Sequence, residues 1–165
     1  MLKRLFIFLS FCVVLSSCKK SESNGGCRYS DSGIVVPASE MASLQAYVSA
    51  NHPSAILNSG GFYYEIVSAG TGVSATSLCS TVGVKYAGYL TNGFKFTSAA
   101  EESTGASYAL GSLVPGWQRG LPLVKAGGTI YLYLPPSLGY GANATATIPA
   151  NSILIFTIQV LAVYN

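Results

Sequence analysis

Residues 84–96, which read VKYAGYLTNGFKF, have the pattern of a β-hairpin. Two runs of aromatic and β-branched residues flank the dipeptide Asn92-Gly93. Such a dipeptide between apolar runs is a strong signal for a tight turn, in which both central residues take positive φ. The stretch therefore predicts two antiparallel strands joined at Asn92-Gly93.

Similar short strands, separated by Gly, Pro, Asn and Ser, are predicted throughout the chain from Gly60 onward. They cover residues 62–67, 80–90, 94–96, 107–111, 129–134 and 152–163. One short helix is expected around Trp117 to Lys125, with Pro122 near an edge of the helix or at a bend. We therefore predict an α+β fold over residues 60–165, in which a curved antiparallel β-sheet wraps around one short helix.

The first residues have the pattern of a secretory signal. Lys3 and Arg4 precede a run from Leu5 to Leu15 that is apolar except for Ser10 and too short to span a bilayer. The next residues, Leu15-Ser16-Ser17-Cys18, resemble the lipobox of bacterial lipoproteins. This resemblance implies a signal peptide over residues 1–17 and a mature chain diacylated on Cys18, anchored to a membrane. The alternative is a plain signal peptide followed by an incidental cysteine.

A tether and a helical extension are expected between the lipid and the domain. Residues 18–36 are polar and rich in Gly and Ser, so we expect a tether that is disordered up to about Cys27. Within the extension, residues 37–59, Pro37 opens a helix that ends near Asn51. Its apolar face consists of Met41, Leu44, Tyr47 and Val48. That face packs on the domain or on a second copy, and the sequence leaves both arrangements and the oligomeric state open.

The cysteines suggest one disulfide bond. Cys12 leaves with the signal and Cys18 takes the lipid, so Cys27 and Cys79 remain as a pair in an oxidising compartment. We predict that they are bonded to each other, which would tie the tether to the domain. Two separate buried thiols are the alternative.

Charge and composition argue against several classes of function. Loss of Lys3 and Arg4 with the signal lowers the formal net charge from +3 to +1, and no basic patch points to nucleic acid. The single histidine, His52, lies before a proline outside the domain, so no Ser-His-Asp or Cys-His set can form. Glu101 and Glu102 are neighbours in a polar loop, a pattern more typical of solvated than of catalytic acids. No metal-ligand spacing is present, and we expect neither metal nor cofactor. The aromatic residues next to glycines favour an apolar binding cavity.

Five stretches together resemble the FKBP family in order and spacing, from about Gly61 to Val163. They are VKYAGYLTNGFKF, LVPGWQRGL, KAGG, LPPSLGYG and IPANSILIFTIQVL. The resemblance implies a pocket between the helix and the sheet, with Trp117 as its floor. It implies a catalytic set of Tyr86, Phe96, Trp117, Tyr140 and Phe156, and substrate contacts from Thr97, Leu113, Val114 and Ile148. The activity it implies is peptidyl-prolyl cis-trans isomerisation of unfolded, proline-containing polypeptides exported to the cell envelope.

Such a pocket needs no acid, base or metal. The obstacle is a rotation barrier of roughly 18 to 20 kcal/mol about a conjugated amide bond. A dry pocket that holds the amide twisted lowers this barrier by differential binding. The resemblance adds the Val114 N–H and the Tyr140 hydroxyl as donors to substrate carbonyls.

Two departures from the family pattern predict reduced activity. Thr97 stands where the family usually has an aspartate, so an acidic group at the pocket edge is expected to be missing. Ala106 stands where a wall aromatic is usual, which predicts a more open pocket. A catalytically weak binding or chaperone module is the alternative function.

Overall fold

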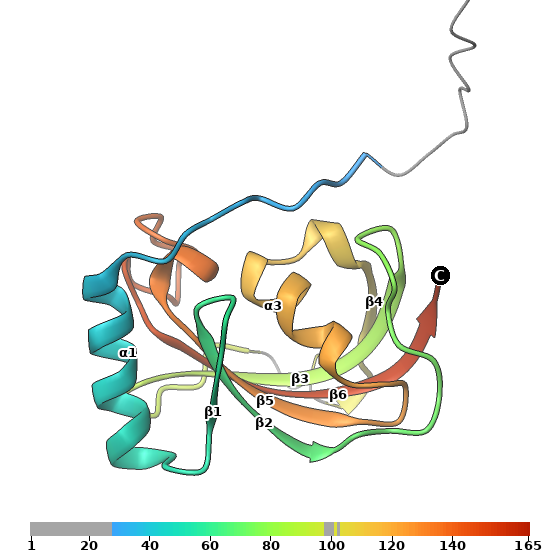
Figure 1. Cartoon of the computed structure of the whole chain (residues 1–165), viewed down its shortest axis with the longest axis horizontal. Coiled ribbons are helices and arrows are strands. Elements are labelled where there is room, and N and C mark those ends of the chain that lie inside the picture. Colours follow the sequence, from blue (N-terminus) through green and yellow to red (C-terminus); the bar gives the residue numbers. More distant parts are fainter. Residues whose placement is uncertain (1–27, 98–100, 102) are drawn as a thin grey trace, which may run out of the picture.

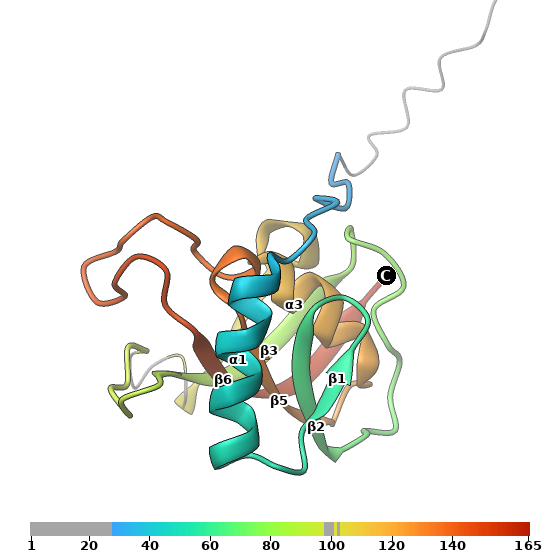
Figure 2. The same cartoon turned by 60° about the vertical axis from the view of Figure 1, so that its left-hand side comes forward.

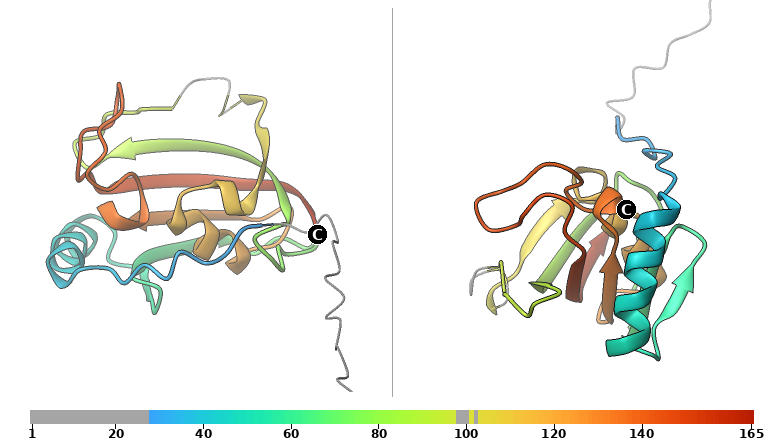
Figure 3. Two further views of the ribbon diagram at one scale, coloured as in Figure 1. Left: turned by 90° about the horizontal axis from the view of Figure 1, so that it is seen from above. Right: turned by 90° about the vertical axis from the view of Figure 1, so that its left-hand side faces the viewer.

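The computed structural model describes residues 28–97, 101 and 103–165. Its centre is a curved six-stranded antiparallel sheet in the order β1-β2-β5-β6-β3-β4. The strands are β1 (Ile56–Asn58), β2 (Phe62–Ser68), β3 (Thr81–Leu90), β4 (Ala106–Ala109), β5 (Thr129–Leu134) and β6 (Leu154–Tyr164). Figure 1 and the left view of Figure 3 show how the sheet curves around the short helix α3. The predicted fold class is therefore confirmed.

Helix α3 (Pro115–Gly120) begins earlier than predicted and continues into a 3₁₀ turn, η2 (Leu121–Leu123). Pro115 suits the first turn because the N–H that it lacks would have no partner there. Pro122 also lacks the N–H that an α-helix would need, and it lies in the 3₁₀ turn. Two further 3₁₀ turns are η1 (Leu110–Ser112) and η3 (Pro136–Leu138).

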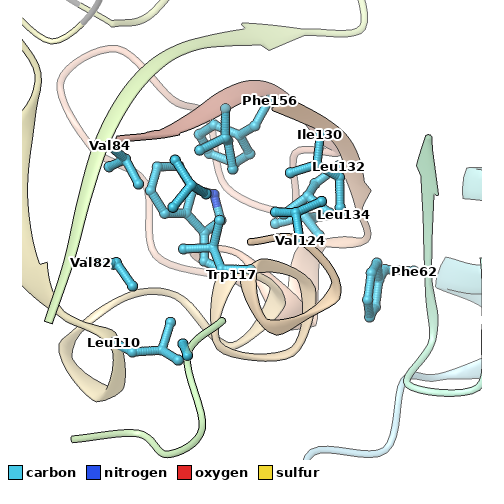
Figure 4. Packing of buried hydrophobic residues seen from close by; sticks show 14 of the residues in the cluster. Phe62, Val82, Val84, Leu110, Trp117, Val124, Ile130, Leu132, Leu134 and Phe156 are labelled. Carbon is cyan, nitrogen blue, oxygen red and sulfur yellow. The ribbon is translucent and has the colours of Figure 1, made fainter. Parts of the chain in front are cut away.

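Two glycines let α3 approach the sheet closely. A Cβ atom at Gly116 would lie 2.5 Å from the side chain of Leu134, and one at Gly120 would lie 2.7 Å from that of Leu132. The main core lies in this interface, where Trp117 points from α3 toward Phe156 (Figure 4). The GWQRG sequence thus sets the distance between helix and sheet.

Helix α1 (Ala38–Asn51) has the predicted bounds and packs on the domain. Its residues Leu44 and Val48 are buried in a second apolar cluster on the face of the sheet opposite α3. Their partners on the sheet are Tyr63, Tyr133 and Ile155. Figure 2 shows α1 beside the strands, so the apolar face that the sequence left unassigned is covered by the chain's own sheet.

The hairpin that the sequence placed at Asn92-Gly93 forms, but with a different turn. Positive φ occurs at Gly93 (84°) and not at Asn92. The Gly93 N–H donates to the Leu90 carbonyl at 2.9 Å, and the Leu90 N–H donates to the Phe94 carbonyl at 2.9 Å. These bonds close a three-residue turn that needs left-handed backbone only at its last residue. Residues 94–96 are therefore not a full strand, and Lys95 forms an isolated β-bridge with Tyr89.

Other strands lie close to their predicted positions, with two differences. Strand β4 begins at Ala106 and gives way to η1 at Leu110, earlier than predicted. Strand β1 was not predicted, and it extends the sheet to residues before Gly60 by pairing with β2. Within the described ranges, no helix combines the length and apolar character needed to cross a bilayer. The predicted signal, Cys18 and Cys27 lie outside these ranges.

Candidate functional site

A cavity of about 470 Å³ opens between α3 and the concave face of the sheet. Its lining includes all nine residues that the family resemblance singled out, which come from separate parts of the chain: Tyr86, Phe96, Thr97, Leu113, Val114, Trp117, Tyr140, Ile148 and Phe156. The same cavity is also lined by Glu101 and Tyr108, neither of which the family resemblance had pointed to as a site residue.

The base of the cavity is a set of four aromatic rings packed edge to face. Trp117 is 3% exposed. The centroid of its indole lies 5.1 Å from that of the Phe156 ring, with 86° between the two ring planes. The Tyr86 ring lies 4.8 Å from the indole, with 90° between the planes. The ring of Phe96 meets Phe156 at 5.6 Å and 84°. Aromatic pairs prefer this geometry because the edge of one ring is positive and the face of the other is negative. The four rings together form an apolar box.

Strand β3 positions one wall of the box through Gly88. A Cβ atom there would lie 2.4 Å from the ring of Phe96 and 3.0 Å from that of Phe156, so only glycine lets Phe96 lie against the strand. The Phe96 N–H donates to the Gly88 carbonyl at 3.0 Å. The Gly88 N–H in turn donates to Oγ1 of Thr97 at 3.0 Å. Thr97 thus holds the segment after the hairpin against β3.

The segment that leads into α3 is fixed by Gln118. Its Nε2 donates to the Leu113 carbonyl at 2.7 Å and to the Gly111 carbonyl at 3.2 Å. The Val114 carbonyl accepts the first helical hydrogen bonds, from the N–H groups of Trp117 and Gln118. These contacts hold the backbone of Leu113 and Val114 at the rim of the cavity.

Tyr140 and Ile148 line the opposite rim. The N–H of Ile148 donates to Oγ1 of Thr145 at 3.0 Å, and this bond helps to hold the loop that contains both residues. Tyr140 is 41% exposed at the mouth. Burial raises the pKa of its hydroxyl, and Glu101 and Tyr108 raise this pKa further. The hydroxyl is therefore protonated at neutral pH and can donate a hydrogen bond.

Glu101 places a carboxylate in the cavity, which corrects two expectations. Its Oε1 accepts a hydrogen bond from the Tyr86 hydroxyl. Burial raises the pKa of Tyr86, and the bond to Glu101 contributes to the rise. The expectation that Glu101 is simply solvated was wrong. The expectation that Thr97 leaves the pocket edge without an acid was also wrong, because the acid comes from a residue four positions later.

Strand β4 contributes an aromatic side chain, that of Tyr108, to the cavity close to Ala106. Both residues lie on β4, two positions apart, so they share one face of the strand. The side chain that lines the cavity is Tyr108. Strand β4 therefore supplies one aromatic wall, and the expectation of a more open pocket beside Ala106 stays a prediction.

Two other predictions concern metals and cysteines. No group of three or more His, Cys, Asp or Glu that could hold a metal ion occurs in the described part of the chain. Cys79 is disulfide-bonded. Its predicted partner, Cys27, lies outside the described residues, and the pairing stays a prediction.

A curved antiparallel sheet with an aromatic cavity over one short helix defines an FKBP-like domain. Residues 74–161 match the model of the family described as FKBP-type peptidyl-prolyl cis-trans isomerase. The chain belongs to this family.

Curated relatives and solved structures agree with this assignment. The chain is 41% identical over 107 residues to the FKBP-type peptidyl-prolyl cis-trans isomerase FkpA of Buchnera aphidicola from Schizaphis graminum, covering 65% of this chain and 42% of that one. It is 39% identical over 106 residues to FkpA of Escherichia coli K12, covering 64% and 39%. The chain thus spans about two fifths of the length of these relatives.

Two crystal structures share the fold. FkpA from Escherichia coli matches with a TM-score of 0.67 and 34% identity, over 76% of this chain and 60% of that one. A peptidyl-prolyl cis-trans isomerase from Pseudomonas syringae matches with a TM-score of 0.66, over 81% of this chain and 100% of that one. At 23% identity the second match shows the fold alone.

Proposed function

We propose that this protein is a peptidyl-prolyl cis-trans isomerase that acts on exposed X-Pro bonds of polypeptides folding outside the cytoplasm. The observation that carries the proposal is the aromatic box of Tyr86, Phe96, Trp117 and Phe156 in one cavity. Uncatalysed isomerisation takes tens to hundreds of seconds and can limit the rate of folding, so a catalyst of this step would speed folding.

Binding in this cavity would favour the twisted amide over the planar one. The proline ring would lie on the Trp117 indole, between the rings of Phe156 and Tyr86. The planar amide is more charge-separated and is better solvated by water, so an apolar cavity disfavours it relative to the twisted form. No bond is made or broken other than hydrogen bonds, and the rate gain comes from differential binding.

Polar groups at the rim would fix the orientation of the substrate. The Val114 N–H and the Tyr140 hydroxyl are the proposed donors to substrate carbonyls, while Leu113, Ile148 and Thr97 form walls. Each 1.4 kcal/mol of preference for the twisted state corresponds to about tenfold in rate. Two such hydrogen-bond donors can therefore raise the rate of isomerisation strongly without acid-base chemistry.

An isomerisation assay on a short Ala-Pro peptide, by NMR exchange or protease coupling, tests the proposal. We expect Trp117→Ala to lower kcat/KM by at least about a hundredfold and Tyr140→Phe by about tenfold. Tyr131→Phe, on the opposite face of the sheet, is the matched control and should match the wild type. Wild-type activity in Tyr140→Phe, which removes only a hydroxyl at the mouth of the cavity, would contradict the donor role. Peptide binding without turnover by the wild type would instead favour a binding or chaperone module.

We further propose an exported, lipid-anchored organisation. It consists of a signal peptide over residues 1–17, a lipidated tether over 18–36, a helical extension over 37–59 and the isomerase domain over 60–165, with β1 of the extension joining the sheet. Mass spectrometry of the protein from the membrane fraction should give a mature chain that begins at diacylated Cys18. Cys18→Ala should abolish this species, and an unmodified mature N-terminus in the wild type would contradict the anchor.

The disulfide proposal has its own test. If Cys27 and Cys79 are bonded to each other, the denatured, unreduced mature protein should show no titratable thiol. Reduction should release two thiols. Two free thiols before reduction would exclude the bond.

A further inference from the structure

The cavity contains one acidic group whose role the family pattern does not supply. Glu101 is the single charged side chain among the described residues that line it. Its carboxylate accepts the hydrogen bond of the Tyr86 hydroxyl. Tyr86 packs edge-on against the Trp117 indole, so the acid holds a ring that forms part of the proline site.

Thr97 does not compete for this role. Its hydroxyl oxygen accepts the Gly88 N–H at 3.0 Å, which uses it to fix the backbone after the hairpin. A threonine side chain also brings no charge. The negative charge of the cavity therefore comes from Glu101. This residue lies four positions after Thr97, which occupies the place of the usual family aspartate.

The position of Glu101 also affects the residues that flank a bound proline. Its charge acts on the hydroxyl of Tyr140, which stands at the mouth of the cavity, where a peptide would enter and leave. A cationic side chain placed there by the peptide would be attracted and an anionic one repelled. Between partly buried charges, such an interaction corresponds to a change of roughly three- to tenfold in affinity, and salt weakens it.

We propose that Glu101 is the positioning residue for Tyr86 and that its charge gives the site a preference for X-Pro segments with a basic side chain beside the proline. This inference rests on the proposed function. It names a substrate class within it, namely proline-containing segments that carry lysine or arginine next to the proline.

Peptides that differ by one charge test the inference. Two pairs are compared, with Lys or Glu directly before the proline and with Lys or Glu directly after it. We expect wild-type kcat/KM to be roughly three- to tenfold higher for the Lys peptide of at least one pair at low salt, and the difference to shrink at about 1 M salt.

Glu101→Gln keeps an oxygen that can accept the hydrogen bond of the Tyr86 hydroxyl, but it removes the negative charge. This variant should abolish the preference for the Lys peptides. The double variant Thr97→Asp with Glu101→Gln returns an acid to the pocket edge and should restore the preference. Glu65→Gln is the matched control, because Glu65 also accepts a tyrosine hydroxyl, that of Tyr133 at 2.9 Å, on the opposite face of the sheet. It should keep the wild-type preference.

Two readouts separate this inference from the proposed function. The affinity of each peptide is measured in parallel by the fluorescence of Trp117, the single tryptophan of the chain. If no peptide is isomerised, the proposed function fails, and the affinities for the Lys and Glu peptides still test Glu101. If the wild type shows no charge preference in rate or affinity, or if Glu101→Gln retains it, the inference is overturned.

Discussion

The ring of Tyr86 meets the indole of Trp117 at a right angle, with the ring centroids 4.8 Å apart. The indole is buried, and its Nε1 has no hydrogen-bond partner among the described residues. The apolar contact with neighbouring rings, and not a polar anchor, thus holds the indole in place. A molecule that enters the cavity must lie against this indole.

Trp117 should therefore report directly on occupancy of the cavity. We expect its emission to change in intensity and wavelength on titration with an Ala-Pro peptide, and the change to saturate. The same peptide with Ala in place of Pro is the control and should give at most a small change. An equal response to both peptides would mean that the proline ring does not bind at the indole.

Gly88 should be essential for the wall formed by Phe96. In Gly88→Ala the new methyl group would lie 2.4 Å from Phe96 and force that ring out of the box. We expect a loss of about 1 to 3 kcal/mol in the free energy of unfolding, measured in urea, and a lower kcat/KM. Gly83→Ala on the same strand is the matched control, because its Cβ atom would meet its neighbours at 3.4 Å or more. Equal behaviour of the two variants would contradict the close approach.

The elements and aromatic residues were predictable because they depend on local pattern. Helix α1 ends where His52-Pro53 ends its apolar periodicity, and β2, β3, β5 and β6 follow stretches rich in β-branched and aromatic residues. Trp117 and Phe156 lie in motifs that resemble the FKBP family, and this resemblance predicted that they share one cavity. Local sequence and ordered motifs were sufficient for these features.

The features that could not be predicted depend on contacts between distant residues or on loop conformation. Glu101 is one of two adjacent acids in a polar loop, and nothing in that stretch indicates which carboxylate reaches Tyr86. Strand β1 has three residues and is defined by its pairing with β2. The turn type at Gly93 depends on which residue takes positive φ, and the dipeptide Asn-Gly is compatible with more than one turn type.

Arg119 should hold the segment before α1 against the domain. Its Nη1 donates to the Gly60 carbonyl at 2.8 Å and its Nη2 to the Ile34 carbonyl at 2.9 Å, while Asp31 lies 3.6 Å away. Figure 1 shows residues 28–37 running along the domain to α1. We expect Arg119→Met, which keeps much of the aliphatic stem, to lower the free energy of unfolding by about 1 to 3 kcal/mol. Limited proteolysis within residues 28–36 should become faster.

Asp31→Asn separates the two kinds of contact made by Arg119. The Asp31 side chain is 73% exposed, so its ion pair should contribute less than about 1 kcal/mol. This variant should therefore resist proteolysis almost as well as the wild type. Equal sensitivity of the two variants would mean that the ion pair, and not the two carbonyl contacts, holds the segment.

Stability should fall in alkaline solution because the fold keeps several tyrosines protonated. Burial is the main cause that raises the pKa of Tyr86, Tyr133 and Tyr140, and Glu65 contributes through its hydrogen bond to Tyr133. Below the ordinary tyrosine pKa of about 10, these hydroxyls are neutral in both the folded and the unfolded state. Above it the unfolded chain loses these protons first, which lowers the free energy of the unfolded state relative to the folded one, so stability decreases as pH rises.

Urea unfolding at about pH 8, 10 and 11 checks this direction, with the tyrosine pKa of about 10 lying within the range. We expect the midpoint to decrease between the last two values, and Tyr133→Phe to show a smaller decrease than the wild type because one of the shifted groups is gone. Tyr164→Phe is the matched control, since Tyr164 is 66% exposed, and it should decrease as the wild type does. Lysines titrate in the same range, but they are common to all three proteins, so the comparison isolates the tyrosine. An equal decrease in Tyr133→Phe and the wild type would exclude a buried Tyr133 hydroxyl as a source of the alkaline sensitivity.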